Sequence, residues 1–224
     1  MSKIVIENLY KIYNEGKDSE FKALKNINLN IEDGEIVIIK GVSGSGKSTL
    51  LSLMAAFSKP SRGRVLVDGE NISKLPDIFA SKFRNEKVGF IFQSFNLIDG
   101  LSVEENVVAP LVLCSSSQSE LDSKLKNALK LANIEHKKEQ NVVDLSGGEK
   151  QRCAIARALV NDPSIILADE PTANLDRENS LKFIEILKTF KKLNKVVVVA
   201  THDTIFDNLE FIDRYVSIAN GEIE

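Results

Sequence analysis

The chain has 224 residues, is 43% hydrophobic and carries a formal net charge of −3. This length and composition predict one large domain with a sizeable buried core, and they exclude a disordered chain. The small negative charge excludes a nucleic-acid partner held by bulk positive charge, so no such partner is expected.

Neither a secretory signal nor a membrane span is expected. The N-terminal stretch MSKIVIENLYKIYNEG lacks the apolar run of a secretory signal, and no apolar run approaches the ~20 residues that cross a bilayer. Cys114 and Cys153 fit no metal-ligand spacing and are interpreted as small apolar side chains in a reducing compartment. These patterns predict a soluble, cytoplasmic chain that reaches a membrane only through a partner.

Strand patterns dominate the first part of the chain. Residues 3–7 and 24–31 alternate like half-exposed strands, whereas residues 36–40 (IVIIK) form the apolar run of a strand buried on both faces. A Gly-rich loop follows, and then a helix is predicted over Thr49–Phe57. Further strands are expected at residues 65–67 and 88–92.

The pattern becomes helical between residues 94 and 160. A polar loop, residues 115–119, precedes leucines at helical spacing, and Glu149–Val160 is a second predicted helix. From residue 161 strands and helices alternate, which is typical of a parallel sheet covered by helices. The elements expected there are Ile165–Ala168, Leu181–Phe190, Val196–Ala200 and Tyr215–Ile218.

The run GVSGSGKST fits the phosphate-loop pattern G-x-x-x-x-G-K-[ST] between a predicted strand and a predicted helix. Its glycines let backbone N–H groups turn toward phosphates, and the helix N-terminus adds positive potential. Lys47 is expected to reach the β- and γ-phosphates, and the Ser48 hydroxyl to bind Mg²⁺. The expected ATP-binding residues of the loop are Gly41, Val42, Ser43, Gly44, Ser45, Gly46, Lys47, Ser48 and Thr49.

The run IILADE, residues 165–170, supplies the second half of such a site. Asp169 emerges at the end of a buried strand and is expected to hold Mg²⁺ directly or through water. Glu170 is the best-placed carboxylate to orient or deprotonate an attacking water. The alternative is a generic acidic strand end, and the phosphate loop in the same chain argues against it.

The run LSGGEKQR, residues 145–152, resembles the signature of ATP-binding cassette (ABC) ATPases, and the resemblance extends over essentially the whole chain. In that family the positions of Ser146, Gly147 and Gly148 clamp the γ-phosphate bound on the opposite subunit. A hydroxyl and glycine amides at the start of a helix suit an anion site. The alternative is that Ser146 is only a helix N-cap.

The resemblance assigns further roles. Gln93 resembles the Q-loop residue that contacts Mg²⁺ and the attacking water, and His202 resembles the switch histidine that hydrogen-bonds the γ-phosphate. Asp176, in the run ANLD, resembles a D-loop dimer contact. Tyr13 resembles the A-loop aromatic residue that stacks on adenine, although Tyr10 lies close by and either ring would serve to cover the core.

The fold that the resemblance implies is α/β. It has a P-loop NTPase (RecA-like) core with an N-terminal antiparallel β subdomain, at residues 1–93 and 161–224, and an inserted α-helical subdomain at residues 94–160. Together these make one ABC ATPase domain, residues 1–224.

The implied function is the ATP-hydrolysing subunit of an ABC transporter, with ATP and Mg²⁺, an ATP-dependent head-to-tail homodimer and a separate integral membrane permease. This places the chain on the inner face of the cell membrane, with a permease helix expected against Ser94–Cys114. The run VGFIFQSFNLIDGLSVEENVVAPL, residues 88–111, resembles the lipoprotein-releasing, macrolide-export and peptide-antibiotic-resistance branch.

Two alternatives remain from the sequence. One is a non-transport ABC ATPase, but residues 50–144 lack the sustained heptads of the chromosome- and repair-type members. The other is a nucleotide-dependent regulatory subunit that has lost hydrolysis. Intact Lys47, Asp169, Glu170 and His202 argue against it.

Overall fold

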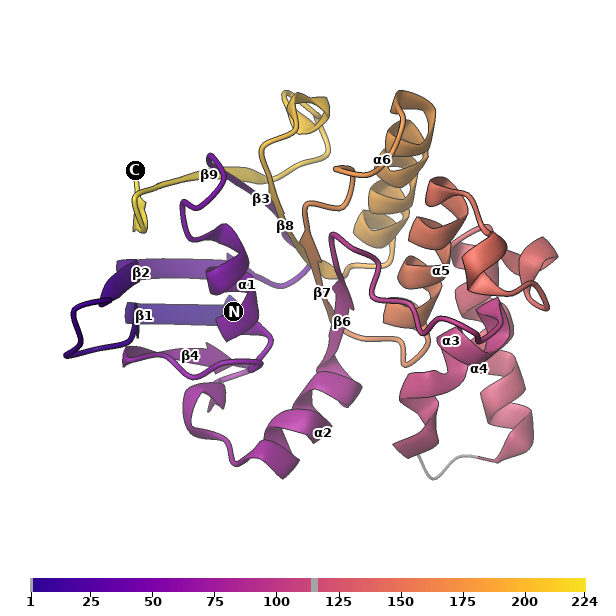
Figure 1. Cartoon of the computed structure of the whole chain (residues 1–224), viewed down its shortest axis with the longest axis horizontal. Coiled ribbons are helices and arrows are strands. Elements are labelled where there is room, and N and C mark those ends of the chain that lie inside the picture. The colour runs from indigo at the N-terminus through magenta and orange to yellow at the C-terminus, as the bar shows by residue number, and fades with distance from the viewer. Residues whose placement is uncertain (1, 114–116) are drawn as a thin grey trace.

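The computed structural model describes residues 2–113 and 117–224 and contains two sheets flanked by helices (Figure 1). Cys114 and the first two residues of the predicted polar loop lie outside the described residues. Cys153 is buried, as expected of a small apolar side chain. Within the described ranges no helix is long and apolar enough to cross a bilayer.

The larger sheet has six strands in the order β10-β9-β3-β8-β7-β6, and all neighbours are parallel except the β10–β9 pair. Both faces of this sheet are covered, and its strands are therefore continuous apolar runs. The strands are β3 (Ile36–Lys40), β6 (Val88–Ile91), β7 (Ile165–Asp169), β8 (Val196–Thr201), β9 (Arg214–Ala219) and β10 (Glu222–Ile223).

Alternate side chains of this sheet enter two separate cores. Ile36 and Ile38 of β3 pack with the helices on one face, whereas Val37 and Ile39 pack toward the smaller sheet on the other. Because successive strand residues point to opposite faces, a wholly apolar strand satisfies both cores. The prediction of a parallel sheet covered by helices is confirmed.

The smaller sheet is antiparallel, in the order β2-β1-β4-β5. Its strands are β1 (Ser2–Tyr13), β2 (Phe21–Glu32), β4 (Arg62–Val67) and β5 (Glu70–Asn71). The predictions for residues 3–7 and 24–31 were too short. Register shifts between Ile6 and Ile12 interrupt the alternation while pairing with β2 continues as far as Tyr13, and such bulges hide a strand from a period-two pattern.

Helix α1 (Lys47–Met54) lies between the two sheets, where it contacts β2, β7 and β8 (Figure 1). It starts two residues before the predicted Thr49, directly after Gly46, and ends before the predicted Phe57. Ala56 has a positive φ of 51°, which no longer fits a right-handed helix. Helix α2 (Asp77–Lys87) was not predicted, because Ala80 is its only buried residue and its apolar pattern is weak.

Helices α3 (Val103–Val108), α4 (Gln118–Leu131) and α5 (Gly147–Leu159) pack on one another beside the edge strand β6, on the side away from the smaller sheet (Figure 1). Each begins with a capping box, in which an N-cap serine and a glutamate three residues later satisfy one another's backbone N–H groups. Short 3₁₀ turns occupy residues 72–74, 109–113, 135–137, 142–144 and 204–206.

Helix α6 (Arg177–Lys192) packs against β8 and begins four residues before the predicted Leu181. Asp176 is its N-cap and accepts a hydrogen bond from the Asn179 backbone N–H at 2.8 Å. The early start follows from this cap, because the first turn is polar and carries no apolar periodicity.

Candidate nucleotide site

The phosphate loop connects the carboxyl end of β3 to α1. Gly46 has a φ of 109°, and a Cβ there would lie 2.6 Å from the Ala23 carbonyl oxygen of β2. Only glycine fits both the positive φ and this close approach. The loop is therefore pressed against the antiparallel sheet, which fixes the distance between β2 and the residues of α1.

A cavity of about 270 Å³ opens beside this loop. It brings together the loop, the end of β7, the segment after β6 and the segment after β8, as the predicted site requires. Its lining residues are Phe21, Ala23, Ser43, Gly44, Gly46, Lys47, Ser48, Thr49, Gln93, Glu170 and His202.

Three predicted loop residues do not line this cavity. Gly41 and Val42 contribute their carbonyl groups to Lys47 instead, and Ser45 is buried beneath the loop at 3% exposure. Phe21 and Ala23 were not identified from the sequence, because their strand was predicted to begin only at residue 24. The antiparallel pairing of β1 with β2 extends the strand to Phe21 and places both residues at the cavity.

Lys47 is a buried cation, only 4% exposed. Its Nζ donates hydrogen bonds to the carbonyl oxygens of Gly41 at 2.7 Å and Val42 at 3.1 Å, and lies 3.3 Å from Glu170 Oε1. A buried charge is tolerated when it is paired and hydrogen-bonded in this way. The ammonium group is thus held at the floor of the cavity, facing the space above the loop.

Glu170 is held between two partners. Its Oε1 lies 3.0 Å from His202 Nδ1, and its Oε2 accepts from the His202 backbone N–H at 3.3 Å. Burial alone raises the pKa of Glu170, but the hydrogen bond from His202 and the charge of Lys47 outweigh burial and leave the pKa below its ordinary value. Glu170 is therefore a carboxylate at neutral pH.

The backbone at Glu170 is unusual. Its φ is 45°, a left-handed conformation uncommon for residues other than Gly, Asn and Asp. The Glu170 N–H donates to the Ala200 carbonyl oxygen at 2.8 Å, which ties the residue to the end of β8. Local strain of this kind is found where a side chain must be aimed at a site.

Ser48 and Asp169 converge on one point, since the Ser48 hydroxyl donates to Asp169 Oδ1 at 2.9 Å. Burial, and then the neighbouring charge of Glu170, raise the pKa of Asp169 despite the Ser48 hydrogen bond. A divalent cation would relieve this cost, and hydroxyl and carboxylate oxygens are ligands that Mg²⁺ accepts. Within the described residues no three His, Cys, Asp or Glu side chains form a metal site by themselves.

Gln93 follows β6, is exposed and lines the cavity. Its carbonyl oxygen accepts a hydrogen bond from Asn174 Nδ2 at 2.8 Å, which joins this segment to the ANLD run. Two residues later, Phe95 has a φ of 61°, and its carbonyl accepts a hydrogen bond from the half-buried guanidinium of Arg157 in α5 at 2.6 Å. The Arg157 group also donates to the Asn96 carbonyl. Arg157 belongs to no motif identified in the sequence, and Asn174, although it lies in the ANLD run, was assigned no role there.

The signature residues lie at the start of α5. Ser146 is the N-cap and is exposed, as is Gly147, whereas Gly148 is buried. A Cβ on Gly148 would lie 2.2 Å from Asn179 Oδ1, so α5 begins in direct contact with the first turn of α6. In the described part of the chain none of these three residues lines the phosphate cavity.

Tyr13, at the end of β1, is 42% exposed and has Lys11 Nζ 5.2 Å from its ring centroid. It pairs directly with Phe21 across the antiparallel strands. Tyr10 lines a different hollow, together with Lys22 and other polar residues. Of the two tyrosines considered from the sequence, Tyr13 is the one beside a residue of the phosphate cavity.

A phosphate loop, a strand-end Asp-Glu pair and a histidine around one cavity define a P-loop nucleotide hydrolase. The family model for ABC transporters matches residues 24–173, more than half of the chain. The ABC transporter ATP-binding protein MJ0796 of Methanocaldococcus jannaschii is 43% identical, over 99% of this chain and 95% of that protein. The chain belongs to the ABC transporter family, as one of its ATP-binding ATPase subunits.

Two solved structures share the fold. The structure of MJ0796 as a post-hydrolysis dimer bound to ADP and Pi has a TM-score of 0.90 and 41% identity, covering 99% of this chain and 96% of that one. The cbiO1 protein of Clostridium perfringens, part of the ABC transporter complex cbiONQ, has a TM-score of 0.87 and 34% identity, covering 100% of this chain and 87% of that one.

The capping box of α5 predicts a pH dependence of stability. The Ser146 backbone N–H and hydroxyl, helped by Lys137 3.3 Å away, lower the pKa of Glu149 from 4.5 to about 2. Because the folded pKa is depressed, the stabilisation is present above pH 4.5 and is lost as the pH falls toward about 2.

The Glu149→Gln variant should therefore lose less stability than the wild type as the pH falls through this window. Urea unfolding from about pH 7 to about pH 3 measures the difference. Glu86→Gln, at an exposed position on α2, is the control and should parallel the wild type. Parallel profiles for Glu149→Gln and the wild type would contradict the prediction.

Proposed function

We propose that this subunit hydrolyses ATP with Mg²⁺, and that Glu170 orients or deprotonates the attacking water. The observation that carries the proposal is the convergence of Lys47, Glu170, His202 and the Ser48–Asp169 pair around one cavity. Phosphoryl transfer depends mainly on positioning and on charge stabilisation, and this cavity offers both.

Each side chain has a separate task. Lys47 contacts the β- and γ-phosphates with its positive charge. Ser48, Asp169 and Gln93 would hold Mg²⁺, which would neutralise negative charge on the phosphates. Glu170, ionised and 3.0 Å from His202 Nδ1, accepts the proton of water, and His202 contacts the γ-phosphate. Tyr13 lies at the adenine end, and the phosphate loop from Gly41 to Thr49 surrounds the triphosphate.

Glu170→Gln should bind ATP but lose turnover, because an amide does not accept the proton. We expect kcat to fall roughly 10²–10⁴-fold, the usual contribution of a general base. The ATP-loaded variant should also persist as a dimer in size-exclusion chromatography, whereas the wild type should not. Wild-type turnover in the variant would overturn the assignment of Glu170.

The dimer forms head-to-tail in this proposal, so that each site is completed by the signature of the second copy. In support, Ser146 and Gly147 are exposed and lie outside the cavity of their own chain. The Ser146 hydroxyl at a helix N-terminus is suited to bind a phosphate. Asp176, exposed beside the signature helix, is the proposed dimer contact.

A mixture of two inactive variants tests this arrangement. Lys47→Ala removes the phosphate-binding cation, and Ser146→Arg blocks the signature. If the sites are shared, mixed dimers contain one intact site, and the mixture should hydrolyse ATP faster than either variant alone at the same total concentration. A mixture no more active than its components would show that each chain builds its site alone.

The same proposal includes a separate membrane permease, with the chain at the inner face of the membrane through that partner. We divide the chain as the sequence indicates, with residues 94–160 as a helical unit and residues 1–93 and 161–224 as the α/β core with its β subdomain. The residues 88–111 resemble the lipoprotein-releasing, macrolide-export and peptide-antibiotic-resistance branch, and we place the subunit there.

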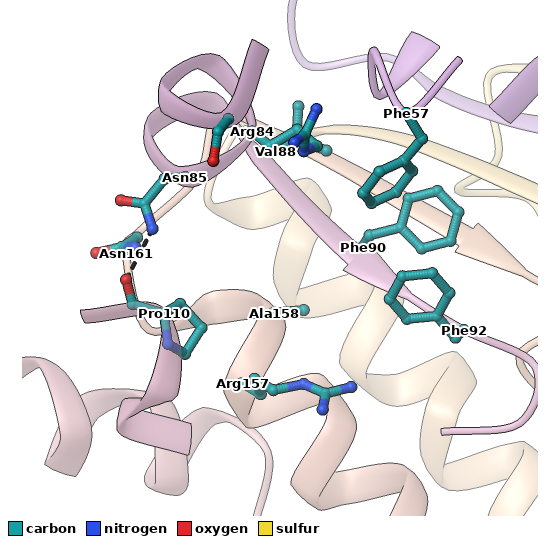
Figure 2. Close-up of a pocket in the computed structure, with 11 residues that line it drawn as sticks. Phe57, Arg84, Asn85, Val88, Phe90, Phe92, Pro110, Arg157, Ala158 and Asn161 are labelled. Carbon is teal, nitrogen blue, oxygen red and sulfur yellow. Dashed lines mark hydrogen bonds between the residues drawn. The ribbon is translucent and has the colours of Figure 1, made fainter. Parts of the chain in front are cut away.

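The partner is expected in a cavity of about 250 Å³ between α2, β6 and α5 (Figure 2). Phe57, Phe90 and Phe92 form its apolar wall, with Phe90 and Phe92 ring centroids 4.4 Å apart. Arg84 and Arg157 supply positive charge, so a short helix with apolar and acidic side chains suits it. In the stretch Ser94–Cys114, which the sequence predicts to form this surface, some apolar residues are buried, whereas Ile98 is 48% and Val112 81% exposed. The expectation for this stretch stays a prediction.

Three of its apolar residues are buried at 3% exposure or less: Val103, Val107 and Leu111. Two of its acidic residues have partners, since Glu105 closes the capping box of α3 and Glu104 lies 3.7 Å from Lys138. Charge reversal at Glu105 would remove the helix cap as well as change the surface. The Ser94–Cys114 stretch borders the cavity through Pro110, which lines one side of it.

Ser81→Arg tests this docking site directly, because the larger side chain would extend from α2 into the cavity. Ser81 lines the cavity, and substitution there should weaken co-purification with the permease and permease-stimulated ATPase activity. Lys82→Arg, one position along and outside the cavity, is the matched control. Basal ATPase activity of the isolated subunit should be unchanged in both. Full permease binding by Ser81→Arg would refute this docking site.

A further inference from the structure

Phe21 is an exposed aromatic residue at the edge of the phosphate cavity. It is the first residue of β2, and its side chain is 57% exposed. Single exposed apolar residues are common on protein surfaces, so exposure by itself indicates nothing. Its position is informative, because Phe21 lines the same cavity as Lys47, Ser48 and His202.

Strand pairing fixes the direction in which the Phe21 ring points. Phe21 and Ala23 both line the cavity, as residues two apart on one strand face should, whereas Lys22 lines the hollow on the other side with Tyr10. Tyr13 pairs directly with Phe21, and directly opposed residues of antiparallel strands carry their side chains on the same face. The two residues are therefore neighbours on one face of the sheet, with Phe21 bordering the cavity.

The support beneath Phe21 is rigid. A Cβ on Gly46 would collide with the Ala23 carbonyl, so the phosphate loop and β2 are in direct contact two residues from Phe21. The Lys25 backbone N–H also donates to the Gly221 carbonyl at 2.7 Å, which ties β2 to the end of the larger sheet. The distance from Phe21 to the phosphate-binding groups is therefore set by backbone contacts.

We infer that Phe21 contacts the nucleoside of bound ATP, between the triphosphate and Tyr13. This inference rests on the proposed function, since it assumes that the loop at Lys47 holds the triphosphate. A nucleotide with its phosphates at Lys47 and its base at Tyr13 passes over Phe21. The two rings then form one apolar wall, and Phe21 covers the ribose and the near edge of the base.

Binding of two ligands separates this role from a general effect on the phosphate loop. ATP carries a nucleoside, whereas tripolyphosphate carries only the phosphate chain. Phe21→Ala should weaken ATP binding at least about fivefold, the lower end of the loss of a base–aromatic contact. Its affinity for Mg²⁺-tripolyphosphate should equal that of the wild type. Equilibrium titration of the full chain with each ligand gives both constants.

Two variants control the comparison. Phe21→Tyr keeps the ring and should bind ATP like the wild type. Phe79→Ala removes an equally exposed ring, 59% exposed on α2, and should alter neither ligand. Thermal unfolding of every variant without ligand should show that the fold is retained.

The outcomes are distinct. Unchanged ATP binding by Phe21→Ala overturns the inference, as does an equal loss for ATP and tripolyphosphate, which would indicate a disturbed phosphate loop. Failure of the proposed function appears elsewhere: Lys47→Ala would then bind both ligands as tightly as the wild type.

Tyr13 variants locate the base relative to the two rings. Tyr13→Ala should raise the apparent KM for ATP several-fold, and Tyr13→Phe should change little. If Phe21→Ala weakens ATP binding while Tyr13→Ala does not, the base does not lie at Tyr13, and the placement of Phe21 between the triphosphate and Tyr13 is overturned.

Discussion

The larger sheet is buried on both faces, and this constraint decides where polar chemistry can lie. Every residue of β8 is buried, and the side chains of β3 and β7 alternate between two apolar cores. An unpaired charge on either face would carry a large desolvation cost. Charged and polar groups therefore emerge beyond the carboxyl ends of these strands, where ligands bind in open α/β sheets. The phosphate loop, Asp169, Glu170 and His202 follow three neighbouring strands, so burial itself assembles the site.

Once these groups are together, each one depends on its neighbours. Lys47 and Glu170 are both nearly buried, and each would be costly without the other, because removal of one partner leaves an uncompensated charge. His202 is largely exposed, and its ring nitrogen contacts the same carboxylate oxygen that faces Lys47. Any phosphate that enters the cavity shares the Lys47 ammonium with Glu170. Nucleotide occupancy is thereby linked to the electrostatic surroundings of Glu170, the carboxylate proposed to activate water.

The connection from this cavity to the helices passes through backbone carbonyl groups. Asn174 holds the Gln93 carbonyl, and Arg157 of α5 holds the carbonyls of Phe95 and Asn96, both of which have positive φ. Guanidinium hydrogen bonds of this kind fix a loop whose conformation is otherwise costly. Arg157 also borders the aromatic cavity (Figure 2), so one side chain contacts both the segment after Gln93 and the surface proposed for the partner.

The sequence by itself determined the fold class, the parallel sheet and the segments that meet around the cavity, because these depend on local patterns: apolar runs, a glycine-rich loop and polar residues at strand ends. Tertiary structure alone decided the rest. The full lengths of β1 and β2 depend on pairing across bulges, and α2 carries too little apolar pattern to be predicted. Phe21 and Arg157 belong to no motif, and Asn174 has no assigned role within the ANLD run. These residues reach the site only through strand register and through contacts with the loop after β6. A local sequence pattern indicates which residues are buried and where the chain turns. The neighbours of the exposed Phe21 ring and of the half-buried Arg157 guanidinium are instead set by distant parts of the chain.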